Sequence, residues 1–556
     1  MTRALSLRDW AMLLVVALAL LLPGFASLPP VDRDEGRYVV SSQRMADTGD
    51  RIDIRYQDQP RYLQPVGIYW LQSTAAALLD GPEHDSIWAY RIPSLLGALI
   101  AIALAGWIGA FYFGRGAGLT AALLLAACFS LNFEARIAKT DAVLLASIVA
   151  AQLALMRAYT DPASGRAMAA LFWAALGIGL LVKGPLILIV VGATIAALVA
   201  WDRKVSWLLR LRPLWGPLLT LAIAVPWYVA IGVITDGAFY AKAVGQSLMG
   251  KVANSQQGHS GPPGYHLALF AWAFWPGSLL AVYAVPFAWR ARAQPAVRFL
   301  LCWIIPTWVV FELVATKLPH YVLPTYPAIA CLAGAALFDP NPAPIGRLGR
   351  LAFAVVSLLW LGVSAVLASV GPLALWRIEG VASPVAITLG VFGFAAACAA
   401  LVLLWRRRKG AAIAAFVLAG ALVLGNTFGY AAPRLEQMWM SPRIEAAVRL
   451  ARPCENGSLV TTPYHEPSLV FLHGRTSTIL APSGAAAAQA LASDSACGLA
   501  LVGAVEEADF LASAARLGLD VVPTTRILGQ NYSNGDELSL TLYRAARAHE
   551  DESGAR

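Results

Sequence analysis

Stretches of about 20 apolar residues alternate with short polar segments along most of the chain. The first, WAMLLVVALALLLPGFASLPP, is followed at once by the charged segment VDRDEGRYVV. A helix of roughly 20 apolar residues is long enough to cross a ~30 Å hydrocarbon core. We identify thirteen such spans, centred near residues 19, 102, 125, 150, 174, 193, 223, 277, 307, 329, 360, 395 and 420. The pattern predicts a polytopic α-helical membrane protein, whose first span is too long for a cleaved signal peptide and is expected to stay as an anchor.

The composition and the placement of charge support this prediction. Hydrophobic residues make up 58% of the chain and charged residues 13%, whereas soluble domains contain about 25% charged residues. The net charge of +9 lies in short loops and forms no basic stripe with interleaved aromatic residues, so it does not indicate nucleic-acid binding. With the N-terminus inside, eighteen Lys and Arg residues lie in inner segments and seven in short outer ones. This bias predicts a cytoplasmic N-terminus and a periplasmic C-terminus in a bacterial inner membrane.

Two domains are expected. Residues 1–430 form the membrane domain, with long outer loops at 30–89 and 234–264; VGIYWLQSTAAALL in the first loop is too short to span and is predicted to lie along the interface. Residues 431–556 are more polar. SLVTTPY and ELSLTLYRA alternate as strands do, and VEEADFLASAARLGL has a helical period, which predicts a small α/β domain. Cys454 and Cys497 in this domain would face an oxidising compartment, where a disulfide between them is an open question.

Acidic residues lie at the outer ends of two spans, where ionisable groups are costly and often functional. In DRDEGRY, Asp34 is a candidate general base that Arg37 would keep ionised and orient. In ARIAKTDAVLLAS, Asp141 opens an apolar span. The alternative for both is a structural role, in which each aspartate caps the helix that follows. The spacing alone leaves both interpretations open.

Basic residues lie in two further outer turns. Lys183 in LLVKGPLIL is expected at the interface, where it would pair with an anionic lipid or extend its ammonium towards the headgroups. ATKLPHYVLPTYP holds Lys317, His320 and Tyr321 in a turn stiffened by prolines. A lysine binds phosphate as a point charge, and a phosphate leaving group needs such neutralisation. These turns therefore favour a site for a phosphate group.

The segment GQSLMGKVANSQQGHSGPPGYH is rich in glycine and amide side chains and carries His259 and His266. We expect it to close over a bound substrate. Two histidines without a clear third ligand favour no metal site, and no other cofactor is expected. The chain has no P-loop and no GxSxG motif. The clusters together predict transfer chemistry on a substrate with a phosphate and a long lipid tail.

Four motifs, DEGRY, KTDA, LVKGP and TKLPHYVLPTYPAIA, resemble those of the lipid A aminoarabinose transferase family. This is a family of GT-C glycosyltransferases, with the protein O-mannosyltransferases as distant relatives. The similarity covers roughly residues 10–340, and KLPHYVLPTYP is its most specific part. It implies a GT-C fold with about 13 transmembrane helices. It also implies inverting transfer of a sugar from a polyprenyl-phosphate carrier to lipid A or another envelope acceptor at the periplasmic face of the bilayer.

The resemblance assigns roles to individual residues. Asp34 would be the principal catalytic or acceptor-orienting carboxylate, and Asp141 a second essential acid. The residues expected to bind substrate are Glu35, Arg37, Tyr38, Arg61, Gln64, Lys183, His259, Lys317, His320 and Tyr321. Those expected around the donor phosphate are Lys183, Lys317, His320 and Tyr321.

One motif departs from the family pattern. Where members commonly read Tyr-Phe-Glu-Lys-Pro, this chain reads Tyr62-Leu63-Gln64-Pro65. Gln64 replaces the lysine expected on the donor phosphate, and Leu63 replaces a glutamate linked to a metal position. Arg61 is the candidate that supplies the missing charge. We therefore expect no metal, and a sugar or acceptor that differs from those of the family.

Two other classes of function remain as alternatives. A transporter or flippase of a lipid-linked sugar would carry ionisable residues at mid-span and inverted repeats with broken helices. A non-catalytic assembly scaffold would have no cavity beneath the first outer loop. Within the transferase class, a protein is an alternative acceptor.

Overall fold

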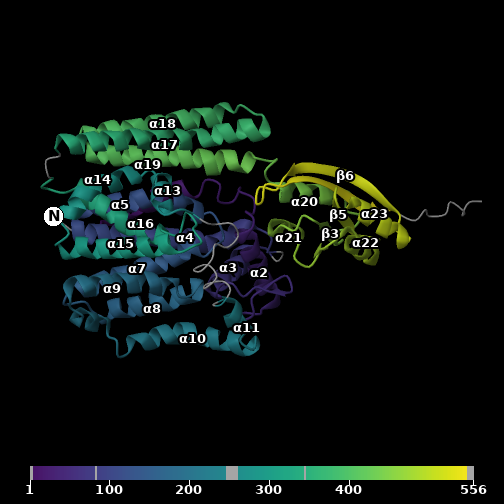
Figure 1. Cartoon of the computed structure of the whole chain (residues 1–556), viewed down its shortest axis with the longest axis horizontal. Helices are drawn as coiled ribbons and strands as arrows, with labels where there is room; N and C mark the ends of the chain where they lie inside the picture. The colour runs from purple at the N-terminus through teal and green to yellow at the C-terminus, as the bar shows by residue number, and fades with distance from the viewer. Residues whose placement is uncertain (1–3, 82–83, 244, 246–260, 343–345, 547–556) are drawn as a thin grey trace, which may run out of the picture.

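The computed structural model describes residues 4–81, 84–243, 245, 261–342 and 346–546. A bundle of apolar helices forms one part of the molecule, and a smaller α/β unit at its end forms the other (Figure 1). The helices up to the end of the bundle are α1 (Leu7–Leu21), α2 (Asp34–Thr48), α3 (Gly67–Leu79), α4 (Ile87–Phe113), α5 (Arg115–Ala127), α6 (Phe129–Glu134), α7 (Asp141–Thr160), α8 (Arg166–Lys183), α9 (Leu186–Asp202), α10 (Gly216–Ile234), α11 (Ala238–Tyr240), α13 (Tyr265–Ala273), α14 (Ser278–Arg290), α15 (Pro295–Leu313), α16 (Tyr326–Leu337), α17 (Arg347–Glu379), α18 (Pro384–Trp405) and α19 (Lys409–Leu424).

Many of these helices are long enough to cross a membrane. In the part of the chain that the structure describes, eight are sufficiently long and apolar, or nine if α13 and α14 form one span bent by 117°. The break between these two helices contains Pro276, which cannot continue a helical hydrogen-bond ladder. Three shorter apolar helices accompany them. The chain is a multi-span membrane protein, while the count of thirteen spans stays a prediction.

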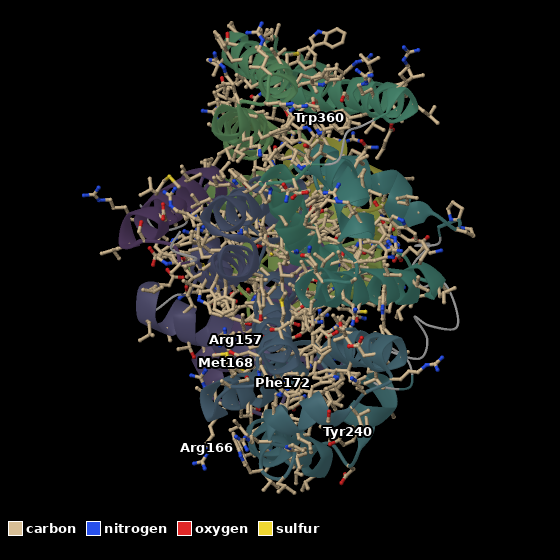
Figure 2. The ribbon with its side chains drawn as sticks, turned by 90° about the vertical axis from the view of Figure 1, so that its left-hand side faces the viewer. Arg157, Arg166, Met168, Phe172, Tyr240 and Trp360 are labelled. Atoms are coloured by element: carbon tan, nitrogen blue, oxygen red, sulfur yellow. A yellow bond between two sulfur atoms is a disulfide. The ribbon has the colours of Figure 1, made fainter. Side chains whose placement is uncertain are left out.

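The two ends of the bundle differ. The N-terminus lies at one end, and α2, α3 and the α/β unit lie at the other (Figure 1). Figure 2 looks onto the N-terminal end, where Arg157 of α7 and Arg166 of α8 are close to the viewer. Since Asp141 begins α7 and Lys183 ends α8, these two residues lie at the opposite end of the same helices, towards the α/β unit.

The first long loop is a folded cap on that end. It contains α2, a two-stranded antiparallel hairpin of β1 (Arg55–Tyr56) and β2 (Gln59–Pro60), and α3. Helix α3 confirms the helix predicted for VGIYWLQSTAAALL. Gly67 at its start approaches the backbone of Leu181 so closely that a Cβ would lie 2.7 Å from the carbonyl oxygen. This contact places the loop directly against the end of α8.

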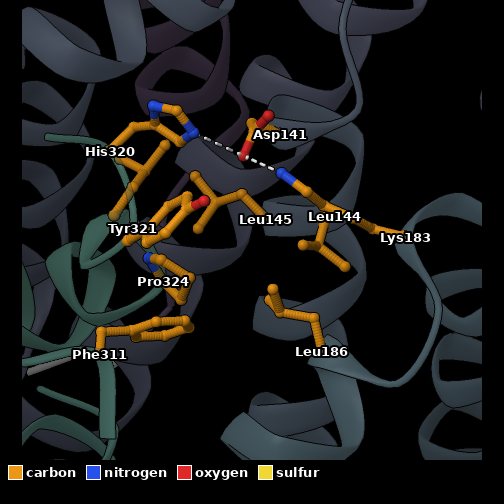
Figure 3. A pocket seen from close by; sticks show the side chains of 10 residues that line it. Asp141, Leu144, Leu145, Lys183, Leu186, Phe311, His320, Tyr321 and Pro324 are labelled. Atoms are coloured by element: carbon orange, nitrogen blue, oxygen red, sulfur yellow. Dashed lines mark hydrogen bonds and ion pairs between the residues drawn. The ribbon is translucent and has the colours of Figure 1, made fainter. Parts of the chain in front are cut away.

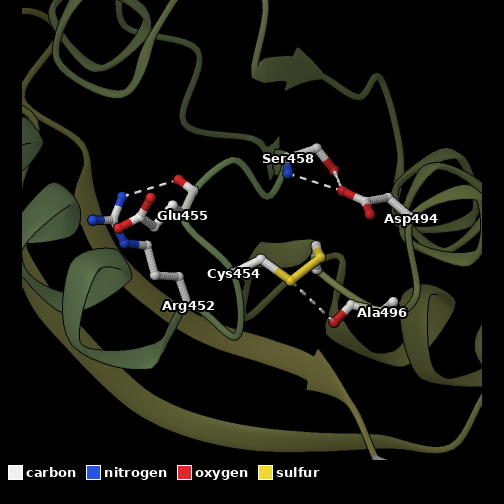
Figure 4. The surroundings of a disulfide bond; sticks show 7 residues. Arg452, Cys454, Glu455, Ser458, Asp494 and Ala496 are labelled. Atoms are coloured by element: carbon white, nitrogen blue, oxygen red, sulfur yellow. Dashed lines mark hydrogen bonds between the residues drawn. A yellow bond between two sulfur atoms is a disulfide. The ribbon is translucent and has the colours of Figure 1, made fainter.

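The C-terminal unit is a five-stranded mixed sheet with the order β4-β3-β5-β7-β6. Strand β3 is parallel to β4 and β5, and β7 is antiparallel to β5 and β6. Its elements are α20 (Met440–Ala451), β3 (Leu459–Thr462), α21 (Pro467–His473), β4 (Thr478–Leu480), α22 (Gly484–Ser493), β5 (Leu499–Gly503), α23 (Glu507–Arg516), β6 (Val521–Gln530) and β7 (Glu537–Ala545). The predicted strands and helix correspond to β3, β7 and α23. Cys454 and Cys497 form a disulfide with a Cα–Cα distance of 5.2 Å (Figure 4).

Candidate functional site

An ion pair between Asp141 and Lys183 lies at the centre of the site (Figure 3). The Lys183 ammonium is 2.7 Å from Oδ1 of Asp141, and the two side chains are 15% and 11% exposed. The residues come from the first position of α7 and the last position of α8, so packing of these adjacent antiparallel helices brings them together. Lys183 therefore has a protein partner, and the expectation of a pairing with lipid is not needed to explain its position.

Neither candidate aspartate acts as a helix cap. The N-cap of α2 is Arg33 and that of α7 is Thr140, and no side chain makes a capping hydrogen bond at either helix. The prediction that Asp34 and Asp141 are N-cap residues is therefore wrong. Both acids nevertheless lie in the first turn of a helix, where a negative charge is favourable.

Three further ionisable groups surround Asp141. Lys139 lies 3.8 Å from its Oδ2 and 3.2 Å from Glu134, and His320 lies 3.5 Å from Asp141 and 3.6 Å from Glu134. His320 is thus between two carboxylates. Burial raises the pKa of Glu134, while Lys139 opposes that rise. We call these five residues, Glu134, Lys139, Asp141, Lys183 and His320, the charged cluster.

Asp34 lies within electrostatic range of this cluster. Its carboxylate is exposed, and no hydrogen bond or ion pair to it occurs among the residues described. Burial lowers the pKa of Lys139, but Glu134, Asp141 and Asp34 outweigh it and raise the net value. Burial raises the pKa of Tyr321 to about 12, with Asp141 and Asp34 contributing in the same direction. Asp34 of α2 and Asp141 of α7 therefore both raise the pKa of Lys139 and of Tyr321.

Arg61 and Tyr38 lie within electrostatic range of Asp34. The Arg61 guanidinium is 5.3 Å from the centre of the Tyr38 ring, which packs in turn on Tyr69. Burial lowers the pKa of Arg61, but Tyr69, Tyr38 and Asp34 outweigh this effect and raise the net pKa. Its Nε is buried and has no hydrogen-bond partner among the described residues. A buried donor without an acceptor is costly, and a ligand oxygen that reached this atom would remove that cost.

An apolar cavity of about 230 Å³ adjoins the charged cluster. Its walls come mainly from the first loop and from α9, α11 and α15, with one residue each from α8 and α10. Lys183 and Tyr321 line both the cavity and the pocket around Asp141. Gln64 lines it too, beside Leu63 and Pro65. A charged centre that opens into an apolar space suits a polar headgroup joined to a hydrocarbon tail.

Lys317 belongs to a second group of residues. Its ammonium donates to the carbonyl of Gly261 at 2.9 Å and lies 3.9 Å from Glu312. Glu312 also accepts from backbone N–H groups at the start of α13 and from Nδ1 of the buried His266. None of the hydrogen bonds and ion pairs in the described part of the chain joins Lys317 to Asp141. His259 lies outside the described residues.

Glu35 and Arg37 have other surroundings than Asp34. Both oxygens of Glu35 bind Arg91, at 2.8 and 2.9 Å, and they also accept from the N–H groups of Ala138 and Val31. Since Glu35 is 1% exposed, these bonds are structural: they join α2 to α4 and to the segment before α7. Burial raises the pKa of Tyr56, and the nearby Arg37 opposes that rise. Roles for Glu35 and Arg37 in substrate binding stay predictions.

Glu134 and Arg91 were not singled out from the sequence. Both are charged residues inside apolar stretches, and that signal alone marks them as candidates for paired or functional groups. The sequence does not show the partner of Arg91, because Arg91 and Glu35 are 56 residues apart. Within the described ranges, no three His, Cys, Asp or Glu residues are grouped in a way that would hold a metal. The expectation of no metal stays a prediction.

Comparison with known proteins adds independent information. Residues 31–238 match the family described as dolichyl-phosphate-mannose-protein mannosyltransferase. The chain is 27% identical over 309 residues to an undecaprenyl phosphate-α-4-amino-4-deoxy-L-arabinose arabinosyl transferase of Pseudomonas paraeruginosa, covering 55% of each chain. It is also 27% identical over 374 residues to the enzyme designated 2 of Pseudomonas fluorescens, covering 65% of this chain and 62% of that one. The matches thus span less than two thirds of these relatives.

The fold matches over nearly the whole chain. The crystal structure of ArnT from Cupriavidus metallidurans bound to undecaprenyl phosphate superposes with a TM-score of 0.74, covering 97% of this chain and 98% of that chain at 20% identity. An oligosaccharyltransferase of Archaeoglobus fulgidus gives 0.54 at 12% identity, covering 98% of this chain and 74% of that one. These likenesses show that the chain has the fold of these structures, as the resemblance in the sequence implied.

Proposed function

We propose that this chain, which belongs to the ArnT-like family of GT-C membrane proteins, is a glycosyltransferase that takes its sugar from a polyprenyl-phosphate carrier. The family model covers the segment that contains Asp34, Asp141 and Lys183. The related sequences are arabinosyl transferases that are named for an undecaprenyl-phosphate donor. The acceptor in this proposal is lipid A or another envelope glycolipid.

One observation carries the proposal: the charged cluster opens into an apolar cavity at the end of the bundle. A polyprenyl-phosphate sugar has the same division into an anionic head and a hydrocarbon tail. Its phosphate would meet Lys183, with Arg61 supplying a second positive charge through its unpartnered Nε. Its tail would extend along the apolar wall formed by residues such as Phe311 and Tyr228.

The chemistry follows from the placement of the acids. An acceptor hydroxyl oxygen attacks the anomeric carbon from the face opposite the phosphate, so that the configuration inverts. The new carbon–oxygen bond forms while the bond to the phosphate oxygen breaks. Asp34, which is exposed and unpaired within the described structure, accepts the hydroxyl proton. Lys183 stabilises the additional negative charge on the departing polyprenyl phosphate. If the acceptor is a phosphate, which is already an anion, Asp34 only positions it.

The same geometry supports an orientation in the bacterial inner membrane. The disulfide in the C-terminal unit is of a kind that forms in oxidising compartments such as the periplasm. Arg157 and Arg166 lie at the other end of the bundle, as expected for a cytoplasmic face. The proposed topology therefore has the N-terminus in the cytoplasm and the site and C-terminal unit in the periplasm.

The first test is Asp34→Asn in the full-length protein reconstituted with polyprenyl-phosphate sugars and an envelope lipid extract. Transfer should fall by about a hundredfold or more, as general-base catalysis contributes ~10²–10⁴-fold. Asp58→Asn is the matched control, because Asp58 is an exposed aspartate in the same loop. Normal turnover by Asp34→Asn would remove this carboxylate from the mechanism.

The sugar and acceptor are found by mass spectrometry of envelope glycolipids and glycoproteins from cells with and without the gene.

A flippase would leave no new covalent product in the reconstituted system. The placement of charge along the helices disfavours that alternative. The charged residues of α8 are its first and last, Arg166 and Lys183, and those of α7 are Asp141 and Arg157, also in its terminal turns. Neither helix carries a charge at mid-span.

A further inference from the structure

We infer that Asp32 is a positioning residue through which the C-terminal α/β unit fixes the first turn of α2, and with it Asp34. The inference deepens the proposed function and rests on it for the role of Asp34. Asp32 lies two residues before the proposed base, in the segment that joins the first apolar helix to α2.

The contact is made by both oxygens of the Asp32 carboxylate. Oδ1 accepts from the backbone N–H of Ser468 at 2.9 Å, and Oδ2 accepts from the Ser468 hydroxyl at 2.6 Å. The N–H of Asp32 donates to the Tyr532 hydroxyl at 2.6 Å. Ser468 is in α21, and Tyr532 is in the turn between β6 and β7. Two separate segments of the C-terminal unit therefore hold one residue of the first loop.

The neighbouring contacts continue this link on both sides. Arg33 lies 3.5 Å from Glu466, which in turn accepts from Asn531 and Ser533 at 2.7 and 2.8 Å. Gly36, one turn into α2, approaches α21 so closely that a Cβ would lie 2.8 Å from the Cβ of Pro467. Only a glycine permits this approach without displacement. The first turn of α2 is thus packed against the C-terminal unit as well as hydrogen-bonded to it.

Asp34 has no such contact of its own. It is exposed and unpaired within the described residues, so its place is determined by the backbone that carries it. A general base must lie within hydrogen-bonding distance of the proton that it accepts, and small displacements reduce the rate strongly. A contact that fixes the backbone two residues away therefore affects catalysis without touching substrate.

The charge of Asp32 offers a readout that a purely structural contact would not give. Burial raises the pKa of Asp32 to about 7, Glu466 and Glu35 add to the rise, and the two bonds from Ser468 oppose it. The titratable and charged groups around it are Arg33, Glu35, Arg37, Tyr56, Tyr464, Glu466 and Tyr532. Removing the Ser468 hydroxyl takes away one of the opposing bonds, so that Asp32 becomes neutral at a higher pH than in the wild type.

The test compares Ser468→Ala with a matched variant, Ser458→Ala, in the full-length protein. Ser458 makes the same pair of bonds to Asp494, from its N–H at 2.9 Å and its hydroxyl at 2.6 Å, but within the C-terminal unit itself (Figure 4). Ser468→Ala should lower kcat about tenfold, since a misplacement of about 1 Å at a reacting centre costs up to about a hundredfold in rate. The donor KM should stay unchanged, because Lys183 and Arg61 are not altered. The acidic limb of the pH profile should move to higher pH.

Ser468→Thr, which keeps the hydroxyl, should restore both kcat and the pH profile, and Ser458→Ala should leave both unchanged. The inference is overturned if Ser468→Ala behaves as the wild type, or if Ser458→Ala shows the same loss. Tyr532→Phe is a second variant, which removes the acceptor for the Asp32 N–H and should also lower kcat.

A second measurement separates this inference from the proposed function. Hydrogen exchange of the backbone amides of residues 31–38 reports the link between the two parts directly, whether or not a donor is turned over. Exchange should be faster in Ser468→Ala and unchanged in Ser458→Ala. Equal exchange in all three proteins would refute the link even in an active enzyme. Faster exchange in Ser468→Ala, found together with a wild type that transfers no sugar, would leave the link standing and refute the function.

Discussion

The ion pair between Asp141 and Lys183 allows a prediction with a defined magnitude. In Lys183→Met, the Asp141 carboxylate, which is 11% exposed in the wild type, loses the ammonium 2.7 Å away. Breaking a buried ion pair by removing one partner costs about 3–5 kcal/mol. Here Lys139 at 3.8 Å and His320 at 3.5 Å remain and offset part of the loss. We therefore expect the variant to be less stable by about 2–3 kcal/mol, below the usual range for such a break.

A double-mutant cycle tests this value. Asp141→Asn with Lys183→Met removes both charges, so the double variant should lose less stability than the sum of the single variants, by about 1–3 kcal/mol. Stability is measured by denaturant unfolding in detergent micelles, and transfer is measured in parallel. Arg157→Met is the control, because Arg157 makes a 2.6 Å pair with Asp161 at the other end of α7. It should not affect transfer.

Two results would refute the reasoning. If the losses of stability add without coupling, the pair is not energetically joined. If Lys183→Met transfers sugar at the normal rate with a normal donor KM, its ammonium does not bind the phosphate. Recovery of stability in the double variant without recovery of transfer is the outcome that fits both proposed roles of the pair.

Two further predictions concern the C-terminal unit. Cys454→Ser should lower the free energy of unfolding of this unit by about 2–4 kcal/mol, seen as a lower Tm that no longer responds to reducing agent; an unchanged Tm would contradict it. Burial raises the pKa of Glu445, but hydrogen bonds from His473 and Arg449 outweigh it and leave the pKa below 4.5. The pair therefore stabilises the fold above that ordinary value and ceases to do so as the pH falls through the lowered pKa. Glu445→Gln should flatten the acid limb of a stability-against-pH curve, and an unchanged limb would contradict it.

The fold was largely predictable because membrane spans and amphipathic segments have strong local signals. The helix at 67–79, strand β7 and α23 all follow from hydrophobic periodicity. The order of the sheet did not follow from it. Strand β5 lies between β3 and β7, and this neighbour relation depends on pairing between distant segments. Periodicity indicates which face of a strand is buried but not which strand lies beside it.

The site was predictable to a similar extent. Asp141, Lys183 and His320 were identified as separate motifs, and the structure brings them into one cluster. Lys317 was expected in the same cluster, but its ammonium donates a hydrogen bond to the carbonyl of Gly261 instead. The sequence distinguishes charged residues in apolar surroundings; it does not show which of them pair, since that depends on how the ends of the helices meet.

The charges of the cluster explain how Gln64 can stand where the family pattern has a lysine. Asp141 and Glu134 carry two negative charges when ionised, and Lys139 and Lys183 balance them. A donor phosphate thus meets no net positive charge from these four groups. The surplus must come from groups outside the two ion pairs, and the buried Nε of Arg61 is such a group. A guanidinium donates hydrogen bonds from N–H groups held in one plane, whereas an ammonium acts as a point charge. If Arg61 takes the place of that lysine, as the proposed function requires, the charge is retained but its geometry changes.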